Sequence, residues 1–125
     1  MSIITDIHAH MTTHAGLAAL IVGRCYPVKL PQTPTLPAVT YQRISSVSTY
    51  SQDGDSNLYR ARWQFSCWST GYVEAFEVAQ QVKAALNLWK GTFGDPAFIE
   101  NMMDFYEPET GIYHHVVDAT IWWGE

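Results

Sequence analysis

The sequence predicts an α+β fold: a single compact domain in which an antiparallel-rich sheet of about four strands carries two helices, in the order αββαββ. Apolar residues recur at helical spacing in residues 5–22 and 70–89, and they alternate with polar residues in residues 59–67 and 112–123. Polar, Gly-containing segments join the strands in pairs, which favours hairpins and antiparallel neighbours. The chain has 125 residues, so residues 1–125 are expected to form one domain around one core.

The first half of the chain is expected to contain one helix, a loop and a hairpin. One face of residues 5–22 is apolar, and Gly23 follows as a helix-ending residue. Four prolines between residues 26 and 37 predict an extended loop. Residues 38–50 predict the first strand and the polar segment 51–57 its turn. In the second strand, the side chains expected to face the core are Tyr59, Ala61, Trp63, Phe65 and Cys67.

The second half is expected to contain a helix and a second hairpin. The helix after residue 70 has a wide apolar stripe that predicts packing on the sheet. Ile99, Met103 and Phe105 predict a third strand by their alternation, and residues 108–111 predict a turn. Residues 112–123 predict the last strand, with one face formed by Tyr113, His115, Val117, Ala119, Ile121 and Trp123.

Composition disfavours several classes of protein. Seven Lys and Arg against twelve Asp and Glu give a net charge of -5, and no basic cluster is present to read or neutralise nucleic acid. The longest apolar run, residues 17–22, is far shorter than the roughly 20 residues of a membrane span. No charged segment precedes an apolar one at the amino terminus, so no secretory signal is expected and folding is expected in a reducing cytosol.

Groups that could carry chemistry are few and scattered. Asp6-Ile-His-Ala-His10 resembles the first metal-binding motif of barrel metallohydrolases, but such barrels need about 250 residues. His10 and His14 have the spacing for one metal on a helix, without the Glu that accompanies such a pair. We therefore expect no catalytic residue, no metal and no cofactor.

Interaction surfaces are better supported than catalysis. Arg60, Arg62 and Gln64 lie on the polar side of their strand, and Trp68 and Trp122 are expected on faces opposite the packed ones. Either a partner surface or a second layer of this chain, such as the first helix or the proline-rich loop, is expected to cover the two tryptophans. Acidic residues occupy the two predicted turns. The candidate interface residues are Arg60, Arg62, Gln64, Trp68, Asp53, Asp55, Glu107, Glu109 and Trp122.

Several segments together resemble the tail completion proteins of long-tailed bacteriophages and prophages. The resemblance extends over nearly the whole chain in the same order. The matching segments are Gly23-Arg-Cys-Tyr-Pro27, Leu36-Pro-Ala-Val-Thr-Tyr-Gln42, Cys67-Trp68, Tyr72 with the helix of Ala75, Ala79, Ala85 and Leu86, and Tyr106-Glu-Pro-Glu-Thr-Gly-Ile-Tyr113 followed by Asp118.

The resemblance implies a non-enzymatic structural protein. It implies a ring, expected to be a hexamer, at the head-proximal end of the tail tube, which terminates tail polymerisation and joins the tail to the head connector. The implied partners are copies of itself, the tail tube protein and a head completion or connector protein, with no direct nucleic-acid readout and no membrane. The implied location is the head-tail junction of the virion, after assembly in the host cytoplasm. The His-rich first helix departs from the family pattern.

Two other functions remain open from the residues alone. One is a small metal-dependent hydrolase that uses His8, His10 and His14, and the other is a peptide-binding adaptor domain that uses a sheet edge.

Overall fold

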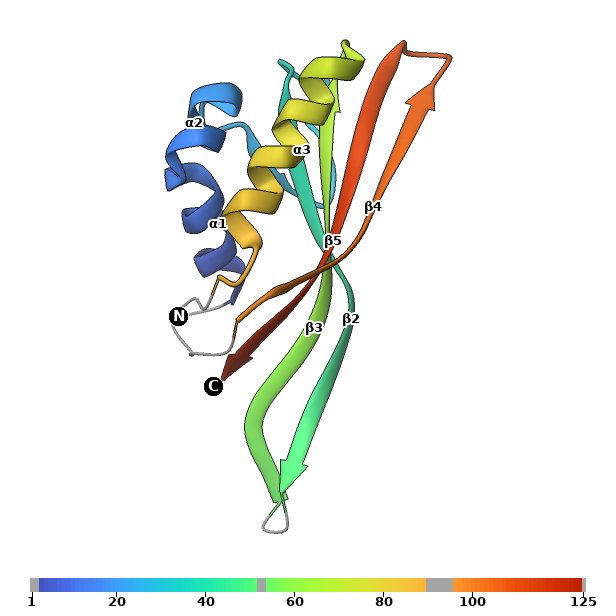
Figure 1. Ribbon diagram of the computed structural model, residues 1–125. Helices are drawn as coiled ribbons and strands as arrows, with labels where there is room; N and C mark the ends of the chain where they lie inside the picture. Colours follow the sequence, from blue (N-terminus) through green and yellow to red (C-terminus); the bar gives the residue numbers. More distant parts are fainter. Residues whose placement is uncertain (1–2, 52–53, 90–95, 125) are drawn as a thin grey trace.

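The structure is a computed structural model that describes residues 3–51, 54–89 and 96–124. Within these residues, three helices lie on one face of a five-stranded sheet (Figure 1). The strand order is β1-β2-β3-β5-β4; β1 pairs with β2 in parallel and the other neighbours are antiparallel. The elements are α1 (Ile3–Thr13), α2 (Ala15–Ile21), β1 (Cys25–Pro27), β2 (Ala38–Ser51), β3 (Gly54–Ser69), α3 (Tyr72–Leu86), β4 (Phe98–Glu107) and β5 (Ile112–Gly124).

The α+β class is confirmed, but the expected count of four antiparallel strands and two helices is wrong. The expected helix over residues 5–22 is two helices, because His14 has extended backbone angles of φ -67° and ψ 118°. At the end of α1, the hydroxyls of Thr12 and Thr13 donate hydrogen bonds to main-chain carbonyls one turn earlier. Such bonds compete with regular helix pairing and favour a break at this point.

A short parallel strand lies within the segment that the prolines predict to be loop. Cys25, Tyr26 and Pro27 pair with Val39, Thr40 and Tyr41. The main-chain N–H of Val39 donates to the carbonyl of Arg24 at 2.9 Å, and that of Val28 donates to the carbonyl of Tyr41 at 2.8 Å. Pro27 is compatible with this strand because it lies at the edge of the sheet, where a proline nitrogen costs no ladder bond.

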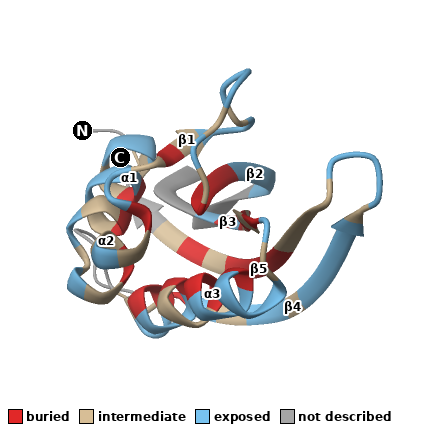
Figure 2. Cartoon of the chain, turned by 90° about the horizontal axis from the view of Figure 1, so that it is seen from above, coloured by how far each residue is buried: buried red, intermediate tan, exposed pale blue. Residues whose placement is uncertain are grey.

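The core lies between the helices and the inner face of the sheet. The expected alternation in β3 is confirmed for the side chains that the structure describes: Ala61, Trp63, Phe65 and Cys67 are buried, while Arg60 and Arg62 are exposed. The side chain of Tyr59, also expected on the core face, lies outside the described ones. The apolar stripe of α3 is also confirmed, as Figure 2 shows by the buried residues on its sheet-facing side. The helical residues that complete the core are Ile7, Met11, Leu17, Ile21, Val78, Ala79, Val82, Ala85 and Leu86.

Strand β4 follows a different alternation from the expected one. A register shift between Ile99 and Asn101 turns the strand over, so Ile99 pairs on the inner face with Ala119 while Met103 and Phe105 lie level with Val116 and His114 on the other face. A β-bulge inserts one residue without a partner and exchanges the two faces beyond it.

The strands are staggered, and the β2–β3 hairpin extends beyond its neighbours (Figure 1). Pairing of β1 with β2 ends at Tyr41, pairing of β4 with β5 begins at the level of Thr120, and β5 ends opposite Leu58. Within the described part of the chain, residues of β3 before Leu58 therefore pair with β2 alone. None of the helices in the described residues is both long and apolar enough to cross a membrane.

Candidate assembly surface

The face of the sheet opposite the helices, here called the outer face, carries most of the candidate residues. In β3 and β5, successive side chains point alternately toward the helices and toward the outer face. Arg62 pairs in the ladder with Thr120, and Arg60 pairs with Trp122. The outer face is formed by Arg60, Arg62, Gln64, Ser66 and Trp68 of β3 and by His114, Val116, Asp118, Thr120 and Trp122 of β5.

A hollow of about 660 Å³ occupies one end of the outer face. Nη2 of Arg62 donates to Oδ2 of Asp118 at 3.0 Å, and the guanidinium of Arg60 lies 5.6 Å from the ring centre of Trp122. Glu100 accepts a hydrogen bond from the hydroxyl of Thr120 at 2.9 Å. The hollow thus contains two cations and two anions beside aromatic rings, a composition suited to polar protein contacts.

An aromatic cluster occupies the other end of the outer face. The ring of His114 lies 4.2 Å from Trp68 and 5.0 Å from Phe105, measured between ring centres. Nε1 of Trp68 donates to the hydroxyl of Thr40 at 2.9 Å, so this side chain is half-buried rather than fully exposed. Burial lowers the pKa of His114, an effect that the neighbouring Glu107 opposes and His115 reinforces.

The structure brings together five of the nine candidate interface residues. Arg60, Arg62, Gln64, Trp68 and Trp122 share the outer face, and Trp122, like Trp68, is half-buried. The remaining four do not join them.

Glu107 and Glu109 lie at the β4–β5 turn. Glu107 is level with Ile112, eight residues along β5 from the partner of Arg62, which corresponds to about 27 Å. Asp55 pairs in the ladder with Tyr50 at the far end of the hairpin, and Asp53 lies outside the described residues.

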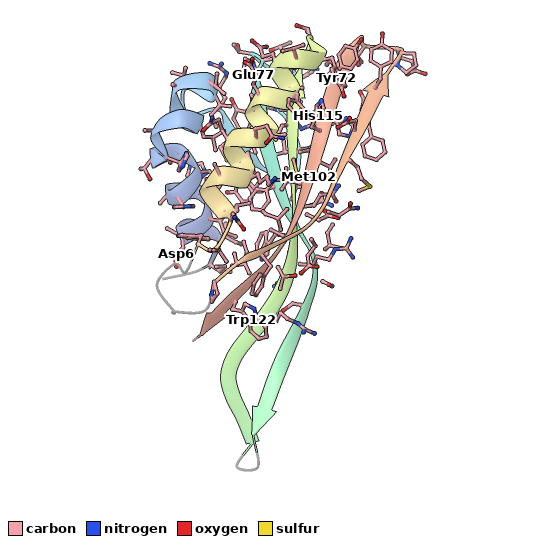
Figure 3. All side chains as sticks on the ribbon, in the orientation of Figure 1. Asp6, Tyr72, Glu77, Met102, His115 and Trp122 are labelled. Carbon is pink, nitrogen blue, oxygen red and sulfur yellow. The ribbon has the colours of Figure 1, made fainter. Side chains whose placement is uncertain are left out.

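A polar cluster under the start of α3 was not predicted from the sequence. Nδ1 of His115 contacts Oδ1 of Asp104, and the hydroxyl of Tyr72 donates to the same carboxylate at 2.9 Å. His115 is 3% exposed and its Nε2 has no partner among the described residues. Figure 3 shows His115 and Tyr72 at the end of the sheet away from Trp122. The alternation of β5 did place His115 on the core face, which was the available signal.

The amino-terminal histidines pack against other parts of the fold. Nε2 of His10 lies 2.6 Å from the carbonyl of Ala85, and its ring stacks on Trp89 at 4.3 Å. Nδ1 of His8 lies 3.5 Å from the hydroxyl of Tyr41. In residues 3–51, 54–89 and 96–124, no three His, Cys, Asp or Glu side chains converge as a metal site would require.

The fold is similar to that of a chain from a solved virion structure. It superimposes with a TM-score of 0.79 on a chain from the virion of the native gene transfer agent particle, at 14% sequence identity, covering 95% of this chain and 92% of that one. The sequence model of the family described as "Tail completion protein gp17" matches residues 5–124. The chain therefore belongs to this family of bacteriophage tail proteins and is a virion structural protein, as the resemblance implies. No individually curated protein matches the chain closely enough in sequence to count as a relative.

Proposed function

We propose that this protein forms a ring at the head-proximal end of the tail tube, where it terminates tail polymerisation and joins the tail to the head connector. The observation that carries the proposal is the family match over residues 5–124. Six subunits are the expected number, which the family resemblance implies. The protein acts through its surfaces and catalyses no reaction.

The mechanism follows from the symmetry of a closed ring. Identical subunits that meet through two different surfaces close after a fixed number, and the two sides of the ring are then unlike. One side can bind the last layer of tube subunits while the other binds the connector and offers no site for further tube subunits. Polymerisation stops because the ring does not reproduce the surface to which it is bound.

The outer face is suited to one of these axial contacts. Its exposed Arg60 and Arg62 lie beside the hollow, and its aromatic cluster supplies the apolar area that stable contacts use. In this proposal Arg60, Arg62, Gln64, Trp68 and Trp122 face a tail or connector protein. Asp55, Glu107 and Glu109, at the ends of the two hairpins, form the periphery of the contact, and Asp53, which lies outside the described residues, stays a candidate for it.

A phage or prophage that lacks the gene tests the proposal. Without this protein we expect unattached heads together with tails of abnormal length, and normal particles when the gene is supplied in trans. Quantitative mass spectrometry of purified virions should find about six copies per tail, the number that a single hexameric ring requires. Normal particles without the protein, or several hundred copies per tail, would contradict it.

A further inference from the structure

One edge of the sheet is acidic. Strand β4 and the turn that follows it contain Glu100, Asp104, Glu107 and Glu109, and residues 96–124 contain no Lys or Arg. Glu100, Asp104 and Glu109 are exposed. β4 is also the last strand of the sheet, so one row of its main-chain N–H and C=O groups has no neighbouring strand in the described chain.

The opposite edge is basic. Residues 22–51 contain Arg24, Lys29 and Arg43 and no Asp or Glu. Arg24 donates to the carbonyls of Pro37 and Leu20, whereas Lys29 and Arg43 are exposed. Among the described residues, neither Lys29 nor Arg43 forms an ion pair with a carboxylate.

Both edges also expose apolar side chains. Phe98, Met103, Phe105 and Tyr106 of β4 are 36% to 51% exposed, although edge strands are usually protected by polar residues. The basic edge has an apolar hollow of about 240 Å³ between α1, β1 and β2. Its lining includes Ile4, Val28, Tyr41 and Trp63, and Arg43 borders it.

The ladder places the two edges at the same height. Arg43 pairs with Trp63, Trp63 pairs with Ala119, and Ala119 pairs with Ile99, which is the neighbour of Glu100. A rotation between neighbouring copies can therefore bring the β4 edge of one copy beside the Arg43 edge of the next. Contact between two different surfaces of identical chains is the kind that closes into a ring.

We propose that the acidic β4 edge of one copy packs against the basic β1–β2 edge of the next copy, with Glu100 and Asp104 facing Arg43 and Lys29 and with the apolar side chains of β4 closing over the hollow beside β1. The occupant of each edge is thus a second copy of this chain. The inference deepens the proposed ring by naming its subunit contact, and it rests on that proposal.

Carbodiimide crosslinking tests the contact directly, because this reagent joins Lys and carboxylate groups that touch. Within one chain, β1 and β4 are separated by four strand spacings, about 19 Å, so a link from Lys29 to Glu100 or Asp104 must join two copies. We expect this link in concentrated protein and in purified tails, and peptides that combine labelled and unlabelled chains when the two are mixed before crosslinking. Links only through other residues would overturn the edge assignment.

A charge exchange provides the energetic test. Arg43→Glu and Glu100→Lys should each weaken self-association by about tenfold in sedimentation velocity, because like charges then meet at the contact. The double variant should regain association, since its reversed edges again attract each other. A mixture of the two single variants should also regain it, because each junction joins either two original or two reversed edges. Lys83→Glu, on the exposed side of α3, is the matched control and should change nothing.

The outcomes separate this inference from the proposed function. A double variant that stays as weak as the single ones would overturn the edge contact, even if the protein is found at the head-proximal end of the tail. Conversely, a chain that crosslinks edge to edge in solution but is absent from particles would support the contact and contradict the function.

Discussion

Arg62 and Asp118 form an ion pair of 3.0 Å on the outer face, in which the arginine side chain is 51% exposed and the aspartate side chain 3%. The two groups differ in solvation, because the carboxylate is buried away from water while the guanidinium remains half exposed to it. Removing the arginine would leave a buried charge without its partner, which is the costly way to break such a pair.

Arg62→Ala should therefore lower the free energy of unfolding by about 1 to 2 kcal/mol, a value reduced from that of fully buried pairs because the arginine is half exposed. Arg60→Ala is the matched control and should cost less than about 0.5 kcal/mol, since Arg60 is exposed over Trp122. Urea unfolding of the two variants measures the difference. Equal costs would show that Asp118 does not depend on Arg62.

Trp63 provides a test of the core. It is 3% exposed and its Nε1 has no hydrogen-bond partner among the described residues. Trp63→Ala should cost about 3 to 5 kcal/mol by opening a cavity. Trp63→Phe should cost less than about 1.5 kcal/mol, because it keeps most of the volume and removes the unpaired N–H. Similar losses for both substitutions, measured by denaturant unfolding, would mean that the indole nitrogen does have a partner.

The turn between β4 and β5 depends on Gly111, whose φ is 69°. Gly111→Ala should cost about 1 kcal/mol, since a side chain disfavours this left-handed conformation, and Gly111→Asn should cost less. Gly71→Ala is the control: its φ is -116°, and a new Cβ would meet its nearest atom, Cβ of Glu74, at 3.9 Å. Thermal melts that rank Gly71→Ala as the more damaging change would contradict this account.

Stability should fall on mild acidification because burial lowers the pKa of His114. The unfolded chain then binds more protons than the folded one at pH values between the lowered pKa and the ordinary value of about 6.5. The contribution is complete above about pH 6.5 and is lost as the pH falls below it. His114→Phe, which keeps a ring between Trp68 and Phe105, should make the free energy of unfolding less dependent on pH in this range. An unchanged slope would exclude His114 as the group responsible.

The two cysteines should react slowly in the native protein. Burial raises the pKa of Cys25 to about 12. The pKa of Cys67 is also raised, first by burial and then by the neighbouring Cys25. Since the thiolate is the reactive form, labelling at pH 8 should follow unfolding and modify both residues together. Rapid labelling of either cysteine in native buffer would contradict the burial described.

The elements that bury a single face were the ones predicted most accurately from the sequence. The alternation of β3 and the stripe of α3 follow from a single buried face, and both were predicted correctly. The outer face was harder to predict because it is neither core nor simple surface. Val116 and Asp118 are 1% and 2% exposed there without a covering helix in the described chain.

Local hydrogen bonding explains the other differences. The break at His14 and the strand at Pro27 depend on a few main-chain contacts that hydrophobic periodicity does not register. The acidic and basic edges of the sheet could not be predicted from the sequence for another reason. Glu100 and Arg43 are 57 residues apart in the chain, and only the strand order places them on opposite sides of one sheet at equal height.

Because the strands are staggered, the length of the β2–β3 hairpin does not affect the packing that stabilises the core. Among the described residues no third strand pairs with the end of the β2–β3 hairpin, so the hairpin's length can change without disturbing the core. Adding two residues to each strand would extend the hairpin by about 7 Å and keep every side chain on its original face, whereas adding one would exchange the faces. The length of the hairpin can thus change in steps of two residues, while the helices and the inner face stay as they are.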